Sequence, residues 1–213
     1  EAYSRPRTNG INAITIREDD ELLQAKLTDG NNEILMGLRS GKAIRFPEEK
    51  VRAVGRTAQG VKGVTLAGPE DEVVGMVVIV DGSKDVLVVS QNGYGKRSAV
   101  EDYRITNRGG KGVKTLSVTD KTGELVAILG VTDEDDLMVI NKSGITIRTG
   151  ADELRTMGRA TQGVRLINLR KNDSIAAVCR TPKSEEEALD GIEGEEGSPE
   201  GGEAPSDETA TEE

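Results

Sequence analysis

The feature that most constrains this sequence is a segment that recurs about every 52 residues. A heptapeptide with basic ends and a glycine at its fifth position occurs three times, as RTAQGVK at 56–62, RGGKGVK at 108–114 and RATQGVR at 159–165. These glycines are spaced by 52 and 51 residues, and a second series keeps the same spacing: Gly41, Gly93 and Gly144. A fixed period of this length is typical of repeat architectures in which each unit is one supersecondary motif.

Each unit also contains four short segments rich in Val, Ile and Leu, separated by turn residues. In chain order, the expected strands are 21–27, 33–38, 42–46 and 61–66; 72–80, 85–90, 96–100 and 113–118; 124–131, 137–141, 145–149 and 164–169; and finally 174–180. Four strands in about 50 residues correspond to one propeller blade. Aromatic residues make up only 2% of the chain, so we expect an aliphatic core, and β-branched residues favour strands.

We therefore predict an all-β, propeller-like domain of repeated four-stranded blades over residues 1–183. It would hold three complete units, and the strand at 174–180 would open a fourth. Propellers close into rings that hide their sheet edges, and about three and a half blades are too few to close. We expect the sequence to be part of a longer domain.

The net charge of −10 is unevenly distributed along the chain. Residues 184–213 contain 13 of the 38 acidic residues and no Lys or Arg, so 1–183 carries 25 acidic and 28 basic residues, a net charge of +3. The 184–213 segment has no aromatic residues and is rich in Glu, Gly, Ser and Pro. Such a composition cannot bury enough apolar surface to offset its ordering entropy. We predict a mildly basic domain followed by a disordered acidic tail.

Two residue types limit the chemistry of the chain. His is absent and Cys179 is the single cysteine, which excludes an internal disulfide and a structural zinc site. No apolar run is long enough to span a bilayer, and no signal-peptide pattern is present. These patterns predict a cytoplasmic protein.

Alignment of the units shows that basic charge keeps its register at four positions. The first column lies four residues after the turn glycine, the second precedes the heptapeptide, and the third and fourth begin and end it. Column by column, the residues are Arg45, Arg97 and Arg148; Arg52, Arg104 and Arg155; Arg56, Arg108 and Arg159; and Lys62, Lys114 and Arg165.

Two interpretations of these columns are open. Duplicated units can simply inherit solvated surface charges. Alternatively, blades related by rotation put each column at one height, and the columns together with Lys111 form a positive band on the rim. Such a band suits duplex DNA, whose phosphates supply a charge about every 1.7 Å of axis, and contacts to the backbone would bind and bend it irrespective of sequence. We predict that these 13 basic residues bind DNA.

The heptapeptide glycines also admit two roles, which do not exclude each other. Structurally, Gly60, Gly112 and Gly163 would supply a turn that a side chain would hinder. Functionally, a glycine lets the backbone approach a phosphate closely while basic side chains flank it.

Six segments carry a resemblance to a known family: YSRPR at 3–7, TDG at 28–30, GKAIRF at 41–46, GRTAQGV at 55–61, QNGYGKR at 91–97 and MGRATQGV at 157–164. From residue 3 to about 180, the chain resembles the DNA-wrapping domain at the C-terminus of the A subunit of bacterial DNA gyrase, a type IIA topoisomerase. The resemblance implies a β-pinwheel, a propeller variant in which neighbouring blades exchange a strand. It also implies that DNA wraps on the rim, and that the acidic tail competes with DNA.

The resemblance carries implications for the whole enzyme too. The A and B subunits of gyrase would form a heterotetramer that supercoils duplex DNA negatively, close to the nucleoid, using ATP and Mg²⁺ held outside this segment. The family's catalytic tyrosine follows an arginine, and none of Tyr3, Tyr94 and Tyr103 does. We therefore expect a non-catalytic segment in which these tyrosines serve packing or lie on the rim.

The sequence departs from the family at its signature, the heptapeptide QRRGGKG of the first blade. NRGGKG at 107–112 matches its end but occupies the place of a later-blade loop, so we expect the complete signature N-terminal to Glu1. Topoisomerase IV has a similar, more degenerate domain and is the nearest alternative. A propeller scaffold for proteins would need exposed aromatic hot spots, and a glycosidase-like propeller would need inward carboxylates and aromatic platforms. Neither pattern is found.

Overall fold

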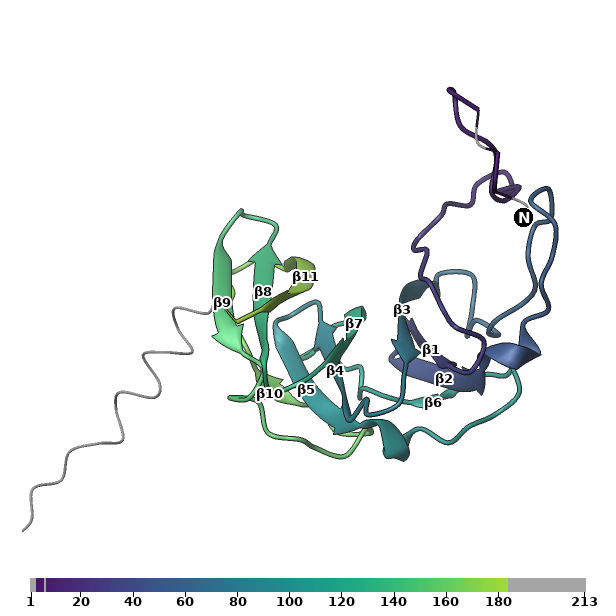
Figure 1. Ribbon diagram of the computed structural model, residues 1–213. Helices are drawn as coiled ribbons and strands as arrows, with labels where there is room; N and C mark the ends of the chain where they lie inside the picture. The colour runs from purple at the N-terminus through teal and green to yellow at the C-terminus, as the bar shows by residue number, and fades with distance from the viewer. Residues whose placement is uncertain (1–2, 6, 184–213) are drawn as a thin grey trace, which may run out of the picture. The chain divides into compact units, whose positions relative to one another are not determined.

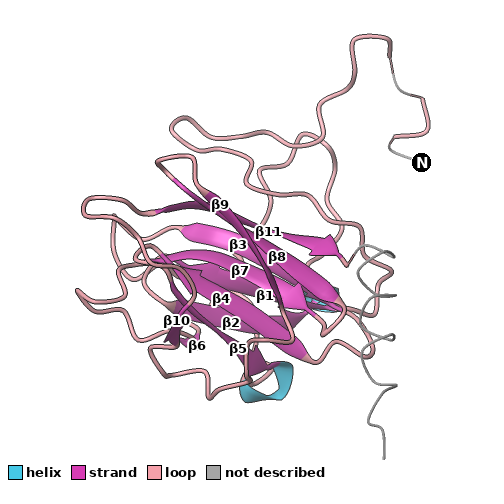
Figure 2. Cartoon of the chain, turned by 90° about the vertical axis from the view of Figure 1, so that its left-hand side faces the viewer, coloured by secondary structure: helices cyan, strands magenta, loops and turns pink. Residues whose placement is uncertain are grey.

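The protein is described by a computed structural model that covers residues 3–5 and 7–183. The tail predicted at 184–213 lies outside the described residues. The described part is built of strands and loops, with two 3-10 helices, η1 (Glu48–Lys50) and η2 (Val100–Asp102), drawn in cyan in Figure 2 where they are in view. None of its helices is long and apolar enough to cross a membrane. The prediction of an all-β fold is confirmed.

The strands of the described residues form three antiparallel sheets, which Figure 1 shows in succession. The first has the order β3 (Val73–Ile79), β1 (Glu33–Leu38), β2 (Lys42–Pro47), β6 (Val113–Lys114). The second has the order β10 (Val164–Arg165), β5 (Tyr94–Ala99), β4 (Asp85–Ser90), β7 (Leu125–Val131). The third has the order β11 (Ile175–Pro182), β8 (Asp135–Asn141), β9 (Thr146–Gly150).

Each four-stranded sheet takes its strands from two units. In the first sheet, β1 and β2 are a hairpin of one unit, whereas β3 and β6 begin and end the strands of the next. The short β6 pairs with β2 through Lys42 and Lys114, and β10 pairs with β5 through Tyr94 and Arg165. The strand exchange that the resemblance implies is therefore present. A sheet is complete only when the following unit is in place.

Nine of the predicted strands agree with the structure to within two residues at each end. The predictions for 21–27 and 61–66 are wrong, because neither segment is a strand. The equivalent segments of later units pair with a hairpin of the unit before them, and no such hairpin precedes 21–27 and 61–66 in the described residues. A strand without a neighbour has no ladder to satisfy its backbone groups.

The strands predicted at 113–118 and 164–169 shrink to the two-residue β6 and β10. The next amides, of Thr115 and Leu116, both donate to the carbonyl oxygen of Gly41, at 2.8 and 3.1 Å, which turns the chain out of the sheet. At the other end, Gly112 has φ +71°, and a Cβ there would lie 2.5 Å from the carbonyl oxygen of Ala43. Gly163 has the same relation to the carbonyl of Gly95, with φ +79°. Both heptapeptide glycines are therefore structurally required.

The sheets pack on one another through clusters of buried, mostly aliphatic side chains. Ile128 on β7 fits over Gly37 on β1, where a Cβ would lie 2.9 Å from Ile128 Cγ2. Buried Leu35 and Val86 belong to one cluster that joins the first sheet to the second. Each such side chain contributes about 1.5–3 kcal/mol when removed from water. The core predicted from composition is confirmed, and it fixes how successive blades sit.

Candidate nucleic-acid interface

The first column of arginines lies within the hairpins. Each guanidinium forms an ion pair with the carboxylate that lies twelve residues earlier: Arg45 with Glu33, Arg97 with Asp85 and Arg148 with Asp136. The Arg97–Asp85 pair measures 2.5 Å, and Arg97 is only 5% exposed. The constant charge of this column therefore has a cause inside the fold.

Two of these arginines also reach the following unit. Arg45 Nη1 donates to the carbonyl oxygen of Val100 at 2.8 Å, and Arg97 Nη1 donates to that of Ala151 at 2.7 Å. Val100 and Ala151 occupy equivalent positions. All three arginines of this column are paired with carboxylates within the protein, and that Arg45, Arg97 and Arg148 bind DNA stays a prediction.

Two arginines of the third column link the 3-10 helices η1 and η2 to the ends of the heptapeptides. Arg108 donates from Nε to the carbonyl oxygen of Lys50 at 2.8 Å and from Nη1 to that of Lys62 at 2.9 Å. Arg159 makes the equivalent bonds one unit later: its Nε donates to the carbonyl oxygen of Asp102 at 2.9 Å and its Nη1 to that of Lys114 at 2.7 Å. Each guanidinium keeps further N–H groups beyond the two that these bonds use. Arg56 makes one longer bond, to the carbonyl of Asn12 at 3.5 Å.

These bonds bring three of the predicted columns together. Arg52 follows Lys50 by two residues, and Arg104 follows Asp102 by two. The first basic cluster is Arg52, Lys62 and Arg108; the second basic cluster is Arg104, Lys114 and Arg159. In each cluster the third residue comes from the next unit, and the other two are exposed. Lys111 and Arg155 are exposed as well.

Arg165 is positioned by an aromatic side chain. Its Nη2 donates to the hydroxyl oxygen of Tyr94 at 2.8 Å, and its Cζ lies 5.4 Å from the ring centroid. Lys121 Nζ lies 5.2 Å from the same centroid, a cation–π distance. The columns did not identify Lys121, because its basic charge does not recur at that place. The tyrosines were predicted to serve packing or to lie on the rim, and Tyr94 and Tyr103, which are 6% and 1% exposed, serve packing.

Lys96 is a second basic residue that the columns did not reveal. It is fully buried, and its Nζ donates to the carbonyl oxygen of Gly158 at 2.7 Å and to Thr161 Oγ1 at 3.1 Å. Burial lowers its pKa from 10.5 to about 8; Asp102 opposes this shift and Arg159 adds to it. The sequence did hold a signal, because the equivalent positions are Ile44 and Ile147.

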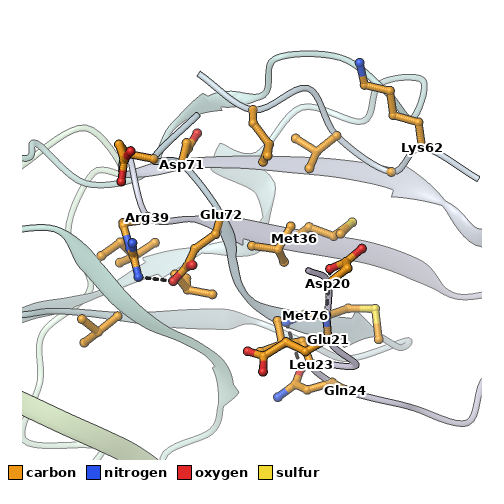
Figure 3. A pocket seen from close by; sticks show the side chains of 18 of the residues that line it. Asp20, Glu21, Leu23, Gln24, Met36, Arg39, Lys62, Asp71, Glu72 and Met76 are labelled. Carbon is orange, nitrogen blue, oxygen red and sulfur yellow. Dashed lines mark hydrogen bonds and ion pairs between the residues drawn. The ribbon is translucent and has the colours of Figure 1, made fainter. Parts of the chain in front are cut away.

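An open hollow of about 1000 Å³ lies against β1 and β3, with Lys62 among its lining residues (Figure 3). Met36 and Met76 supply apolar surface, and Arg39, directly after β1, forms an ion pair with Glu72, directly before β3. That pair ties the first unit to the strand that completes its sheet. Within residues 3–5 and 7–183, no three His, Cys, Asp or Glu side chains gather in a way that could hold a metal ion.

Repeated antiparallel sheets that exchange strands, with basic residues in register along the units, define a β-propeller domain of the pinwheel type. The chain belongs to the family described as DNA gyrase C-terminal domain, beta-propeller, whose model matches residues 1–29, 33–79, 84–132 and 135–180. The four matched segments follow the period of the repeat.

Individual relatives agree with this membership. The A subunit of DNA gyrase from Staphylococcus aureus, in strains MRSA252 and NCTC 8325 / PS 47, is 45% identical over 186 residues, which covers 87% of this chain and 21% of the relative. The chain thus spans about a fifth of the length of the curated relatives it matches. A solved DNA gyrase A C-terminal domain is similar with a TM-score of 0.73 and 26% identity, covering 81% of this chain and 58% of that one.

The C-terminal domain of DNA topoisomerase IV is also similar in structure. Its TM-score is 0.80 at 22% identity, and the match covers 92% of this chain and 62% of that chain. At this identity the likeness shows the fold alone.

Proposed function

We propose that this domain binds duplex DNA through the two basic clusters, irrespective of sequence, and wraps the duplex as it binds. It would do so as the C-terminal part of the gyrase A polypeptide and so support negative supercoiling. Family membership supports this proposal, and the arrangement of charges identifies the residues that would contact DNA.

One observation carries the proposal: Arg108 and Arg159 each donate hydrogen bonds to two backbone carbonyls of the preceding unit. One of these carbonyls lies two residues before an exposed arginine, and the other belongs to an exposed lysine. Three positive charges are thereby gathered at each junction between units. No carboxylate ion pair of Arg52, Lys62, Arg104 or Lys114 is found in the described residues. These charges therefore remain available for phosphates.

The mechanism follows from charge and curvature. Each phosphate that a lysine or arginine neutralises releases counterions, and the logarithm of the affinity falls with the logarithm of salt by about 0.9 per phosphate. A duplex that follows successive clusters must bend, and contacts to the backbone give no preference for sequence. ATP, Mg²⁺, the gyrase B polypeptide and the cleaving tyrosine would belong to the other parts of such an enzyme.

A topology assay tests the proposal. The full chain is bound to nicked plasmid, the nick is sealed, the protein is removed and the linking-number distribution is read on a gel. We expect a shift that grows with protein concentration, because a chiral wrap is trapped by ligation. A variant with Arg52, Lys62, Arg104 and Lys114 changed to Gln is the matched control. Tight binding by the wild-type chain without any shift in linking number would contradict the wrapping.

A further inference from the structure

The proposed interface does not use Lys96, the buried cation on β5. Its Nζ lies beneath the third heptapeptide and donates to two consecutive carbonyls, those of Gly158 at 2.7 Å and of Arg159, as well as to the hydroxyl of Thr161. The first and third units have Ile44 and Ile147 at this position. The second unit is therefore the one of the three with a cation beneath a loop.

The two carbonyls determine the direction of two amides. The described residues contain no cis peptide bond, and in a trans peptide the N–H points opposite to the C=O. The oxygens of Gly158 and Arg159 point inward at Lys96, so the N–H groups of Arg159 and Ala160 point outward. Ala160 is exposed, and neither N–H donates to another group in the described part of the chain.

Successive outward N–H groups make a concavity that binds anions. We infer that residues 158–160 form a backbone phosphate site, and that Lys96 is the residue that positions it. The inference rests on the proposed function, since the natural ligand would be a phosphate of duplex DNA. Lys96 acts through the loop and does not touch the phosphate.

The surroundings of the loop favour an anion. The guanidinium of Arg159 lies at the loop itself, where it is bonded to the carbonyl of Lys114. The loop of the unit before is built differently: its Gly109 N–H is taken by the carbonyl of Gly63, and Ile44 lies below it. That loop has the exposed Lys111 where this one has Gln162. The two loops thus present positive charge by different means, one through a side chain and the other through its backbone.

A titration with inorganic phosphate tests the site directly. The ¹⁵N-labelled full chain is followed by NMR as phosphate is added at constant ionic strength. We expect saturable shifts of the amide resonances of Arg159 and Ala160, weakened severalfold in Lys96→Met. Lys142→Met, which removes the same charge from an exposed turn, should show the same phosphate-induced shifts as the wild-type chain.

Binding of a short DNA duplex gives the second readout. We expect Lys96→Met to bind severalfold more weakly than both the wild-type chain and Lys142→Met. Amides of Arg159 and Ala160 that ignore phosphate in the wild-type chain would overturn the inference, and so would equal responses in the wild-type and Lys96→Met chains. If the wild-type chain fails to bind the duplex, the proposed function fails, while the phosphate titration still decides the backbone site.

Discussion

Arg159 and Lys114 belong to different units, and the guanidinium of the first donates a 2.7 Å hydrogen bond to the backbone carbonyl of the second. The same relation joins Arg108 to Lys62 at 2.9 Å. The basic charge in register at these positions therefore reflects the exchange of strands as well as any ligand. Arg108 and Arg159 thus each hold a loop in place and add their positive charge to a basic cluster.

Arg97 should be essential for stability. Arg97→Met removes one partner of a pair whose side chains are 6% and 13% exposed, and it leaves Asp85 buried without its counter-charge. We expect a loss of about 3 kcal/mol in the free energy of unfolding, measured by urea denaturation. Arg39→Met is the matched control, because the side chains of Arg39 and its partner Glu72 are 37% and 55% exposed, and it should cost about 1 kcal/mol or less. Equal losses in the two variants would show that burial of the pair does not matter.

The second column should act on binding and leave stability unchanged. Changing Arg52, Arg104 and Arg155 together to Gln removes three exposed charges. We expect weaker duplex binding for every sequence tested and a salt dependence that is shallower by about 0.9 for each phosphate that is no longer neutralised. Fluorescence anisotropy over a range of salt concentrations measures both. An unchanged slope would remove this column from the interface, provided that urea denaturation shows unchanged stability.

Lys96 should make stability depend on pH in the alkaline range. Its pKa falls from 10.5 to about 8 in the folded protein, chiefly because of burial, with Asp102 opposing and Arg159 adding to the shift. Between these two pH values the unfolded chain binds more protons than the folded one, so stability rises with pH. Relative to Lys96→Met, the free energy of unfolding of the wild-type chain should increase by up to about 1.4 kcal/mol per pH unit. A difference that stays constant from pH 8 to 10.5 would contradict the buried ammonium.

Asp71 should stabilise the folded protein at neutral pH, and this stabilisation should be lost in acid. Burial raises its pKa, but hydrogen bonds from the amides of Ala67 and Ser40 outweigh this and hold the pKa below its ordinary value of 3.8. A lowered pKa gives stability that is present above pH 3.8 and is lost as the pH falls through the folded-state value. Asp71→Asn should therefore cost about 1–2 kcal/mol near neutral pH, and the cost should shrink in acid. Thermal unfolding of both chains across this range measures it, and a cost independent of pH would refute the assignment.

Much of this protein could be predicted from its sequence, because hydrophobic alternation and turn glycines act locally. The period of the repeat, the hairpins β1–β2, β4–β5 and β8–β9, and the aliphatic core all follow from patterns within one unit. The columns of basic residues were also visible, because each unit repeats its own spacing. The sequence did not show whether the side chains of a column point to solvent or into the protein.

Only the tertiary structure decided which charges face outward. Arg45 and Arg52 are seven residues apart and equally basic, yet the first is largely buried against Glu33 and the carbonyls of the next unit, whereas the second is exposed. The same holds for Lys96, whose role depends on a loop more than sixty residues away. A pattern within the chain determines what can form a strand, and the exchange of strands between units determines which side chains remain for a partner, because burial depends on residues far apart in sequence.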